Sequence, residues 1–211
     1  MFEIGKIRFR PFEREDIPLL LNWENRHRVT LFSRGQPVVF KNRDELERKY
    51  EKDLEDDDRQ TLVVEIIEND KAIGVATIKK HSKKVKNADI GTYIGEMDFW
   101  NMGLGTNITL GLCEMLFFHK NYDRISAWSS STNKRAHKVL ERFGFKKTGV
   151  ARKSGYLMGR RIDFVLFDLL KEEYMENRKN HLAEYLEDKS IYLREYCSIN
   201  SVKKRKPGCK N

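Results

Sequence analysis

The chain has 211 residues, of which 39% are hydrophobic and 35% charged, and its 41 Lys and Arg against 32 Asp and Glu give a formal net charge of +9. This length and composition predict one globular domain and exclude both a largely disordered protein and a large multidomain enzyme. Seven basic residues and one acidic residue lie at 189–211, so the basic excess is mostly a feature of the C-terminal end.

The sequence lacks the features of a membrane, secreted or zinc-binding protein. No apolar run approaches the about 18 residues that a membrane-spanning helix needs, and charged residues interrupt the segment where a signal peptide would be apolar. Cys113, Cys197 and Cys209 are odd in number and widely spaced, which predicts neither a disulfide framework nor a zinc site. We therefore expect a cytoplasmic protein with no metal cofactor and no membrane partner.

Hydrophobic periodicity predicts the secondary structure. Alternating apolar and polar residues predict strands, whereas apolar residues three and four positions apart predict helices. In the first half of the chain we expect a strand at 4–12, a helix ending near Asn25, a loop at 33–37, a helix after Asn42, a hairpin of strands at 61–67 and 72–78, and a strand at 88–94.

The second half continues the alternation of strands and helices. We expect a buried helix over 108–116, a strand at 124–129, a helix over 136–143 that Gly144 ends, a hairpin of strands at 146–156 and 162–170, a polar helix at 175–186 and a basic tail at 201–211. These seven or so strands with their helices are typical of an α/β sheet that has helices packed on its faces.

A glycine-containing turn joins the strand at 88–94 to the following helix. Residues 100–106 of this turn read Trp-Asn-Met-Gly-Leu-Gly-Thr. The two glycines allow a tight turn and a close approach of a ligand, while the first N–H groups of a helix and the positive end of its dipole attract phosphate oxygens. Neither a dinucleotide-binding fingerprint nor a Walker loop fits, because residue 108 is Ile and no Lys follows Gly105. The segment therefore predicts a binding site for a phosphate-bearing ligand.

The same segment resembles the GNAT superfamily of acyl-CoA-dependent N-acyltransferases, in which a [QR]-x-x-G-x-[GA] motif wraps the pyrophosphate of coenzyme A. Four motifs in the correct order resemble the branch that includes the ribosomal-protein N-terminal acetyltransferases: Phe99-Trp100 before Gly103-Leu104-Gly105-Thr106, Asn133 to Ala136 leading into Val139 to Phe145, Tyr156 to Asp163, and Glu172-Glu173-Tyr174. The matches cover about residues 4–174. The resemblance implies a GNAT fold with a mixed central sheet in a domain at 1–174, followed by a C-terminal helix and basic tail at 175–211.

The resemblance also implies how the chain binds coenzyme A. Backbone groups near Ile94 would pair with the pantetheine arm, Asn133 would contact the pantetheine or cysteamine end, and Arg142 would lie near the adenosine 3′-phosphate. The residues that would hold the pyrophosphate are Met102, Gly103, Leu104, Gly105 and Thr106. Two of these roles have structural alternatives, because Asn133 could be a helix N-cap and Arg142 a solvated surface residue. Trp100 replaces the Gln or Arg of many relatives, so backbone groups must bind the phosphates without that side chain.

Several catalytic positions of the family are changed in this chain. Leu140 stands where many members have the Tyr that protonates the departing thiolate. Ala136 stands where the terminal-acetylating relatives often have Ser, and Gly155 where they have a carboxylate. The base that deprotonates an ammonium substrate would then be another carboxylate, acting directly or through water.

Three carboxylates are candidates for that base. Asp89 takes the place of the acidic residue in the family's A-E-I-G-Y strand and is the first candidate, followed by Glu65 and Glu96. The structural alternative for Asp89 is a strand-edge carboxylate that faces water or a lysine such as Lys86.

The leading hypothesis is an enzyme that moves an acetyl group from acetyl-CoA to a primary amine by direct attack in a ternary complex. No Cys or Ser stands in a recognisable nucleophile motif, so no covalent intermediate is expected. The amine would be a protein N-terminus, a polyamine or a small metabolite. The alternative is a catalytically weak accessory protein that binds coenzyme A or associates with RNA or the ribosome, because a fold does not by itself determine function.

Two charged segments bear on the partners. The acidic run at 55–58, and the likeness of the stretch from Asp44 into Glu65 to spermidine N-acetyltransferases, favour a polyamine, although such a run is also typical of a solvated helix end. The basic cluster at 203–206 could contact phosphate, RNA or the ribosome, and is also the composition of a disordered tail. A homodimer is a further expectation.

Overall fold

The structure of the protein, a computed structural model, describes residues 1–31, 39–82 and 85–185. The loop expected at 33–37 and the basic tail expected at 201–211 lie outside these residues, as do Cys197 and Cys209. Within the described residues, no helix is both long enough and apolar enough to cross a membrane.

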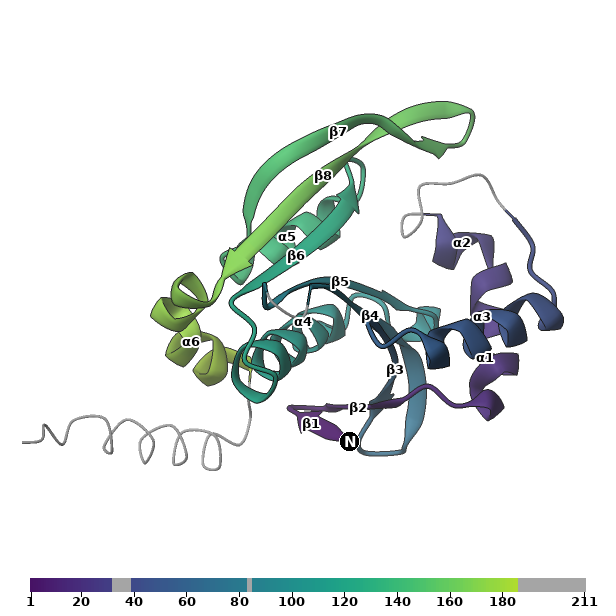
Figure 1. The fold of residues 1–211 in the computed structure, drawn as a ribbon, viewed down its shortest axis with the longest axis horizontal. Helices are drawn as coiled ribbons and strands as arrows, with labels where there is room; N and C mark the ends of the chain where they lie inside the picture. The colour runs from purple at the N-terminus through teal and green to yellow at the C-terminus, as the bar shows by residue number, and fades with distance from the viewer. Residues whose placement is uncertain (32–38, 83–84, 186–211) are drawn as a thin grey trace, which may run out of the picture.

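The described residues form eight strands in one mixed sheet, in the order β1-β2-β3-β4-β5-β6-β8-β7 (Figure 1). The strands are β1 Phe2–Ile4, β2 Ile7–Pro11, β3 Arg59–Ile66, β4 Lys71–Ser82, β5 Asn87–Ile94, β6 Arg124–Ser130, β7 Lys146–Leu157 and β8 Arg160–Leu170. β5 and β6 run parallel, and the other neighbouring pairs run antiparallel. Both predicted hairpins are confirmed, and the second turns at Met158 and Gly159, whose positive φ angles suit a tight hairpin turn.

The N-terminal segment is the part of the sheet that the sequence predicted wrongly. The single strand expected at 4–12 is two strands, β1 and β2, which form a hairpin on their own. Gly5 has a φ of +57°, a conformation that glycine adopts without a steric penalty, so the chain reverses there. The alternating pattern hid this turn because a glycine at an exposed position looks like an ordinary polar position of a strand. The sheet therefore has eight strands among the described residues rather than about seven.

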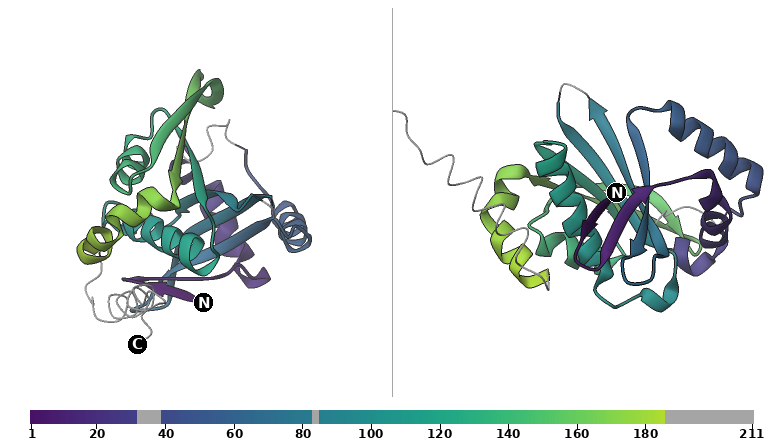
Figure 2. Two further views of the ribbon diagram at one scale, coloured as in Figure 1. Left: turned by 60° about the vertical axis from the view of Figure 1, so that its left-hand side comes forward. Right: turned by 90° about the horizontal axis from the view of Figure 1, so that it is seen from below.

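Helices cover both faces of the sheet (Figure 2). On one face lie α1 Ile17–Asn25, α2 His27–Thr30 and α3 Arg43–Glu55, and on the other lie α4 Leu104–Glu114, α5 Lys134–Arg142 and α6 Lys171–Tyr185. Short helical turns occur at η1 Arg14–Asp16, η2 Met97–Phe99 and η3 Met115–His119, and η3 is a π-helical turn that extends α4. Alternate residues of β4 belong to the two apolar layers, because Val75 packs under α1 and α3 whereas Ala76 packs with α4.

Local sequence signals place the ends of two of these helices. At the start of α3, the Asn42 side chain accepts from the Glu45 N–H at 2.9 Å, and the Glu45 carboxylate accepts from the Asn42 N–H at 3.1 Å. This reciprocal capping box satisfies two backbone donors that have no partner inside the helix. Gly144, just after α5, has a φ of +89°, as expected for a glycine that ends a helix.

The sheet opens into a fork between β5 and β6. The two parallel strands pair over four residues, from Asn87 with Arg124 to Ile90 with Ala127. Beyond that point β5 continues to Ile94 paired only with β4, and β6 continues to Ser130 paired only with β8. Residues 91–94 of β5 and 128–130 of β6 therefore each lack a strand partner on their inner side, and these two segments form the arms of the fork.

Helix α6 is joined to the core by a buried polar cluster. The Glu114 carboxylate, on α4, accepts from the Tyr174 hydroxyl at 2.8 Å and from Arg178 Nε and Nη2 at 2.9 and 2.7 Å. Burial and the nearby Glu114 raise the pKa of Tyr174 well above its usual range, so its hydroxyl stays protonated and donates. The helix begins at Lys171, four residues earlier than expected. It therefore continues through residue 174, where the sequence predicts that the domain ends, and that division of the chain stays a prediction.

We expect Glu114→Ala to lower the free energy of unfolding by about 3–5 kcal/mol, because it removes the buried carboxylate that the Arg178 guanidinium and the Tyr174 hydroxyl contact. The matched control is Lys147→Gln, which breaks an ion pair with Glu141 whose side chains are 57% and 47% exposed. Such a surface pair contributes about 0–1 kcal/mol. Urea unfolding followed by circular dichroism measures both variants, and equal losses would contradict the structural role given to Glu114.

Candidate active site

The glycine turn follows the β5 arm of the fork after the short helical turn η2. The Trp100 indole Nε1–H donates to the carbonyl of Ile94 at 2.9 Å and ties the turn to the end of β5. Trp100 also packs against the apolar layer of α1 and α3. The side chain that replaces the family's Gln or Arg thus has a structural role. It occupies the Ile94 carbonyl, which is one of the backbone groups in the region expected to pair with the pantetheine arm, and that pairing stays a prediction.

The turn itself forms a cradle of backbone groups at the start of α4. Gly103 is the N-cap of α4 with a φ of +78°, and its carbonyl accepts from the Thr106 N–H at 2.9 Å. This leaves the N–H groups of Leu104 and Gly105 without an acceptor inside the helix. A Cβ added to Gly105 would meet no atom within 4 Å, so open space lies beside these donors. Open space next to free N–H groups at the positive end of a helix fits the binding of a phosphate.

The side chains of the turn contribute little to this cradle. Those of Leu104 and Thr106 are buried, and the Met102 side chain is 63% exposed. Any contact that the five predicted residues make with a phosphate would therefore come mostly from the backbone.

The other two residues predicted to bind the cofactor lie at the two ends of α5. The Asn133 side-chain oxygen accepts from the Ala136 N–H at 3.2 Å, so the N-cap alternative is confirmed, and a contact with the pantetheine stays a prediction. Arg142 is the last residue of α5 and is exposed, with no ion pair to any described residue. The structure does not bring Arg142 into the glycine turn, and its role near a 3′-phosphate also stays a prediction.

Asp89 lies on β5, one residue before the fork opens. Its Oδ1 is 2.8 Å from Nε2 of His81, and the two side chains are 25% and 44% exposed. Cα of Asp89 is opposite Lys79 on β4 and Ser126 on β6. The alternative of a partner such as Lys86 is replaced by this contact with His81, which leaves Asp89 accessible from solvent.

Glu96 lies just beyond the far end of the same arm. Its Oε1 accepts from the Trp23 indole Nε1–H at 2.7 Å, and Arg26 Nη1 is 3.9 Å from its other carboxylate oxygen. The neighbouring Gly95 is required here, because a Cβ on it would lie 2.2 Å from the Trp23 ring. Glu96 thus connects α1 to the segment just after β5. The end of β5 at Ile94 is itself roughly 17 Å along the strand direction from Asp89.

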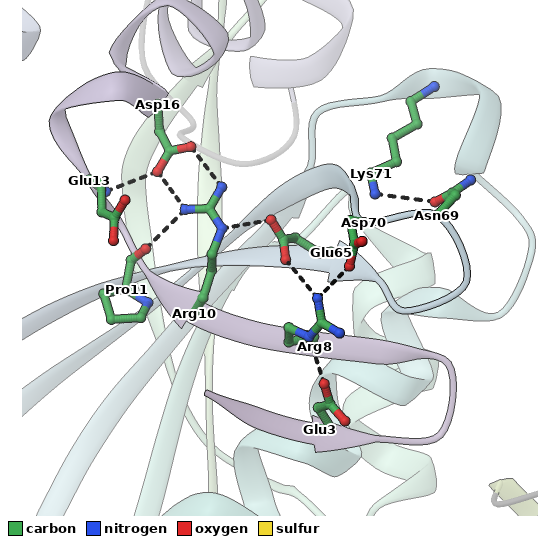
Figure 3. A network of polar contacts seen from close by, with 10 residues as sticks. All are labelled: Glu3, Arg8, Arg10, Pro11, Glu13, Asp16, Glu65, Asn69, Asp70 and Lys71. Carbon is green, nitrogen blue, oxygen red and sulfur yellow. Dashed lines mark hydrogen bonds and ion pairs between the residues drawn. The ribbon is translucent and has the colours of Figure 1, made fainter.

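Glu65 lies on β3, two strands away from the fork. Its carboxylate is 2.6 Å from Arg10 Nε and 3.6 Å from Arg8 Nη1, and Arg10 in turn holds Asp16 (Figure 3). The residue is buried, with 6% of its surface exposed. The structure therefore does not bring Glu65 together with Asp89 or Glu96, and it gives this carboxylate a clear structural role between two guanidinium groups.

Cys113 is fully buried in α4, where burial raises the pKa of its thiol well above the usual range. Across residues 1–31, 39–82 and 85–185, no group of three or more His, Cys, Asp or Glu side chains could hold a metal ion. Leu140, at the position of the family's Tyr, is buried in the core under α5.

Sequence reasoning missed His81. It stands where the register between β4 and β5 shifts, between the pairs Lys80 with Ala88 and Ser82 with Asn87. An extra residue at such a β-bulge turns its side chain out of the regular alternation, which here lets His81 reach Asp89. The pattern of a strand predicts alternation but not a bulge, so the sequence carried no signal for this contact.

Comparisons with known proteins identify the family and the fold. A family model described as an acetyltransferase (GNAT) domain matches residues 6–146. The uncharacterized N-acetyltransferase p20 of Bacillus licheniformis is 28% identical over 171 residues, which cover 80% of this chain and 95% of that protein.

Solved structures of spermidine N-acetyltransferase from Vibrio cholerae share the fold. The complex with CoA and spermine has a TM-score of 0.74 at 20% identity, over 81% of this chain and 98% of that chain. A dodecameric structure in an intermediate state has a TM-score of 0.69 at 20% identity, over 82% of this chain and 98% of that chain.

The family match spans most of the described residues, from the β1–β2 turn through the fork, the glycine turn and α5. Members of this family use acetyl-CoA as the acetyl donor. The chain belongs to the acetyltransferase (GNAT) domain family and is an N-acetyltransferase.

Proposed function

We propose that the protein transfers the acetyl group of acetyl-CoA to a primary amine by direct attack, with both substrates bound at the fork. The observation that supports this most is the arrangement along β5. Asp89, accessible from solvent, stands one residue before the opening, and the cradle at Gly105 follows the end of the same strand. A phosphate site and a carboxylate at the two ends of one open strand edge suit an extended thioester and its acceptor.

In this proposal, the N–H groups of Leu104 and Gly105 hold the pyrophosphate, and the inner edge of β5 near Ile94, apart from the Ile94 carbonyl that Trp100 contacts, lies along the pantetheine arm. Asn133 and Arg142 are the proposed contacts from α5. When bound, acetyl-CoA supplies the activated acetyl group, and the protein positions the thioester and the amine relative to each other. Holding amine and thioester together can provide a large part of the rate enhancement by itself.

Asp89 is the proposed base. The amine nitrogen forms a bond to the acetyl carbon, the carbon–sulfur bond breaks, and Asp89 accepts the proton that the amine loses, directly or through one water. His81 acts as a positioning residue, because its Nε2–H can donate to Asp89 Oδ1 and hold the carboxylate toward the fork. With Leu140 in place of a Tyr acid, coenzyme A leaves as a thiolate and takes its proton from solvent.

The acceptor class is a primary amine, and three kinds remain in this proposal. The Vibrio cholerae structures are described as spermidine N-acetyltransferases, which favours a polyamine by analogy of fold. A protein N-terminus and a small metabolite are the other two. The basic tail is where we would look for RNA or ribosome contacts, and homodimer formation remains our expectation.

We expect Gly105→Asp to weaken acetyl-CoA binding at least about tenfold, because the added carboxylate fills the open space and repels phosphate. The variant should fold, since a Cβ at this position meets no atom within 4 Å and an acidic residue suits a helix N-terminus. Isothermal titration calorimetry with acetyl-CoA measures the change, with Gly105→Ala as the matched control. A folded Gly105→Asp variant that binds as tightly as the parent would place the phosphate site elsewhere.

We expect Asp89→Asn to lower kcat/KM about 10²- to 10⁴-fold with little change in acetyl-CoA affinity, because it removes the base and keeps the size of the side chain. An alkyl ammonium has a reference pKa of about 10.4, so raising the pH supplies free amine and should recover part of the loss. Rates of thiol release between pH 6 and 9.5 give the profile.

Three further variants test the assignment. His81→Gln keeps an N–H donor to Asp89 and should lose much less activity than His81→Ala. If Asp89→Asn leaves the profile unchanged while Glu96→Gln or Glu65→Gln removes its acidic limb, the base is one of those residues. If no amine is acetylated at any pH although acetyl-CoA binds, the protein is the accessory type with a weak or absent turnover.

A further inference from the structure

The face of the sheet around Asp89 is cationic. Arg59 on β3 is opposite Lys79 on β4, and Lys79 is opposite Asp89 on β5. Directly opposed residues of antiparallel strands point to the same face, with Cβ atoms about 4.5–5.5 Å apart. Two cationic side chains therefore lie on the same face as the proposed base. The Cβ atom of Lys79 is about 5 Å from that of Asp89, and the Cβ atom of Arg59 is about 10 Å from it.

These two cations differ in how far they are already neutralised. Lys79 is exposed and forms no ion pair with any described residue. Arg59 Nε is 3.2 Å from Asp53 Oδ1, so its charge is shared with α3. Lys79 is thus the cation beside Asp89 that remains free to bind an anion.

The cationic character continues beyond Arg59 into a surface hollow of about 490 Å³ along α3. Its lining consists of five cationic and three acidic side chains: Lys41, Arg48, Lys49, Lys52, Arg59, Glu45, Asp53 and Asp56. Lys41 and Lys49 point to the buried Glu24, at 2.9 and 3.8 Å. Arg48 and Lys52 are exposed and have no ion pair with any described residue.

The acidic run that favoured a polyamine makes local contacts at the end of α3. The Asp56 carboxylate accepts from the Asp58 N–H at 2.9 Å and closes the turn after α3. The carbonyl of Asp57 accepts from the Lys80 ammonium group. This run therefore behaves as a helix end, while the surface that leads from it to Asp89 presents Arg59 and Lys79.

We infer that the acceptor is a primary amine that carries an anionic group, a carboxylate or phosphate, within a few bonds of the nitrogen. This inference rests on the proposed function and specifies its substrate class. Asp89 would attract the ammonium end, and Lys79, one strand away, the anionic end. A polyamine would place its second positive charge near Lys79, where like charges repel, whereas an amine with an anion matches both charges at once.

The test compares amines of matched shape with saturating acetyl-CoA, following thiol release. β-Alanine is compared with propylamine, O-phosphoethanolamine with ethanolamine, and spermidine is the polycation. We expect kcat/KM about tenfold or more higher for the anionic member of at least one pair, as a single nearby charge can provide at low salt. Peptides that start Ala-Asp and Ala-Asn separate an acidic protein N-terminus from a free small amine. Preference for spermidine or for the neutral amines would overturn the inference.

Variants at Lys79 identify the cation. Lys79→Gln should reduce the preference for the anionic amine, and Lys79→Glu should reverse it. The control is Lys6→Gln, which removes one exposed lysine at the β1–β2 turn, at the far edge of the sheet, and should leave the preference unchanged. A preference that persists in Lys79→Glu would contradict the assignment.

A binding measurement separates failure of the inference from failure of the proposed function. O-phosphoethanolamine and ethanolamine are titrated onto the full-length protein with coenzyme A present, and binding is followed by calorimetry. If no amine is acetylated, the proposed function fails, and tighter binding of O-phosphoethanolamine that Lys79→Gln abolishes still supports the inference. The inference is overturned if neither ligand binds, or if the parent and Lys79→Gln bind both ligands with equal affinity.

Discussion

The separation of β5 from β6 is the constraint on which the rest of the structure depends. Parallel neighbours require a crossover connection, and α4 is the main element of that connection. α4 is buried along nearly its whole length, and a Cβ on its Gly111 would lie 2.4 Å from the Phe9 ring. Packing this close fixes the axis of the helix, and with it the direction of its first N–H groups. The cradle at Gly105 thus owes its position to core packing several residues away.

The carboxylates around the sheet divide by what holds them. Glu114 and Glu65 are buried and contact guanidinium groups, and Glu96 accepts from the Trp23 indole and bridges α1 to the end of β5. A proton on any of these would disrupt a contact that joins two elements of the fold. Among the described residues, the side chain of Asp89 has a polar contact with the exposed His81, at the point where the sheet opens. Proton transfer at Asp89 therefore has the smallest structural cost among these four carboxylates.

The relation to spermidine N-acetyltransferases is one of fold, and the charges on the sheet surface carry separate information. In our proposal, the fork positions the acceptor, and the side chains opposite Asp89 decide which acceptor is attracted. In this chain those side chains are Lys79 and, beyond it, Arg59. The fold and the surface charge can diverge in evolution, because substitutions at exposed positions of a strand can reverse the charge there without disturbing the buried face.

The sequence by itself determined the elements that have local causes: the capped helix α3, the helix that Gly144 ends, the β7–β8 hairpin and the glycine turn before α4. The motif in that turn also indicated the family. It failed at Gly5, where a turn fits the alternation of a strand, and it proposed Glu65 and Glu96 alongside Asp89 because residue type and strand position cannot show what a carboxylate contacts. Only the tertiary structure decided that Glu65 lies between two arginines, that a bulge brings His81 to Asp89, and that Lys79 stands beside it. These facts depend on strand register and order, which arise from packing between segments far apart in the chain.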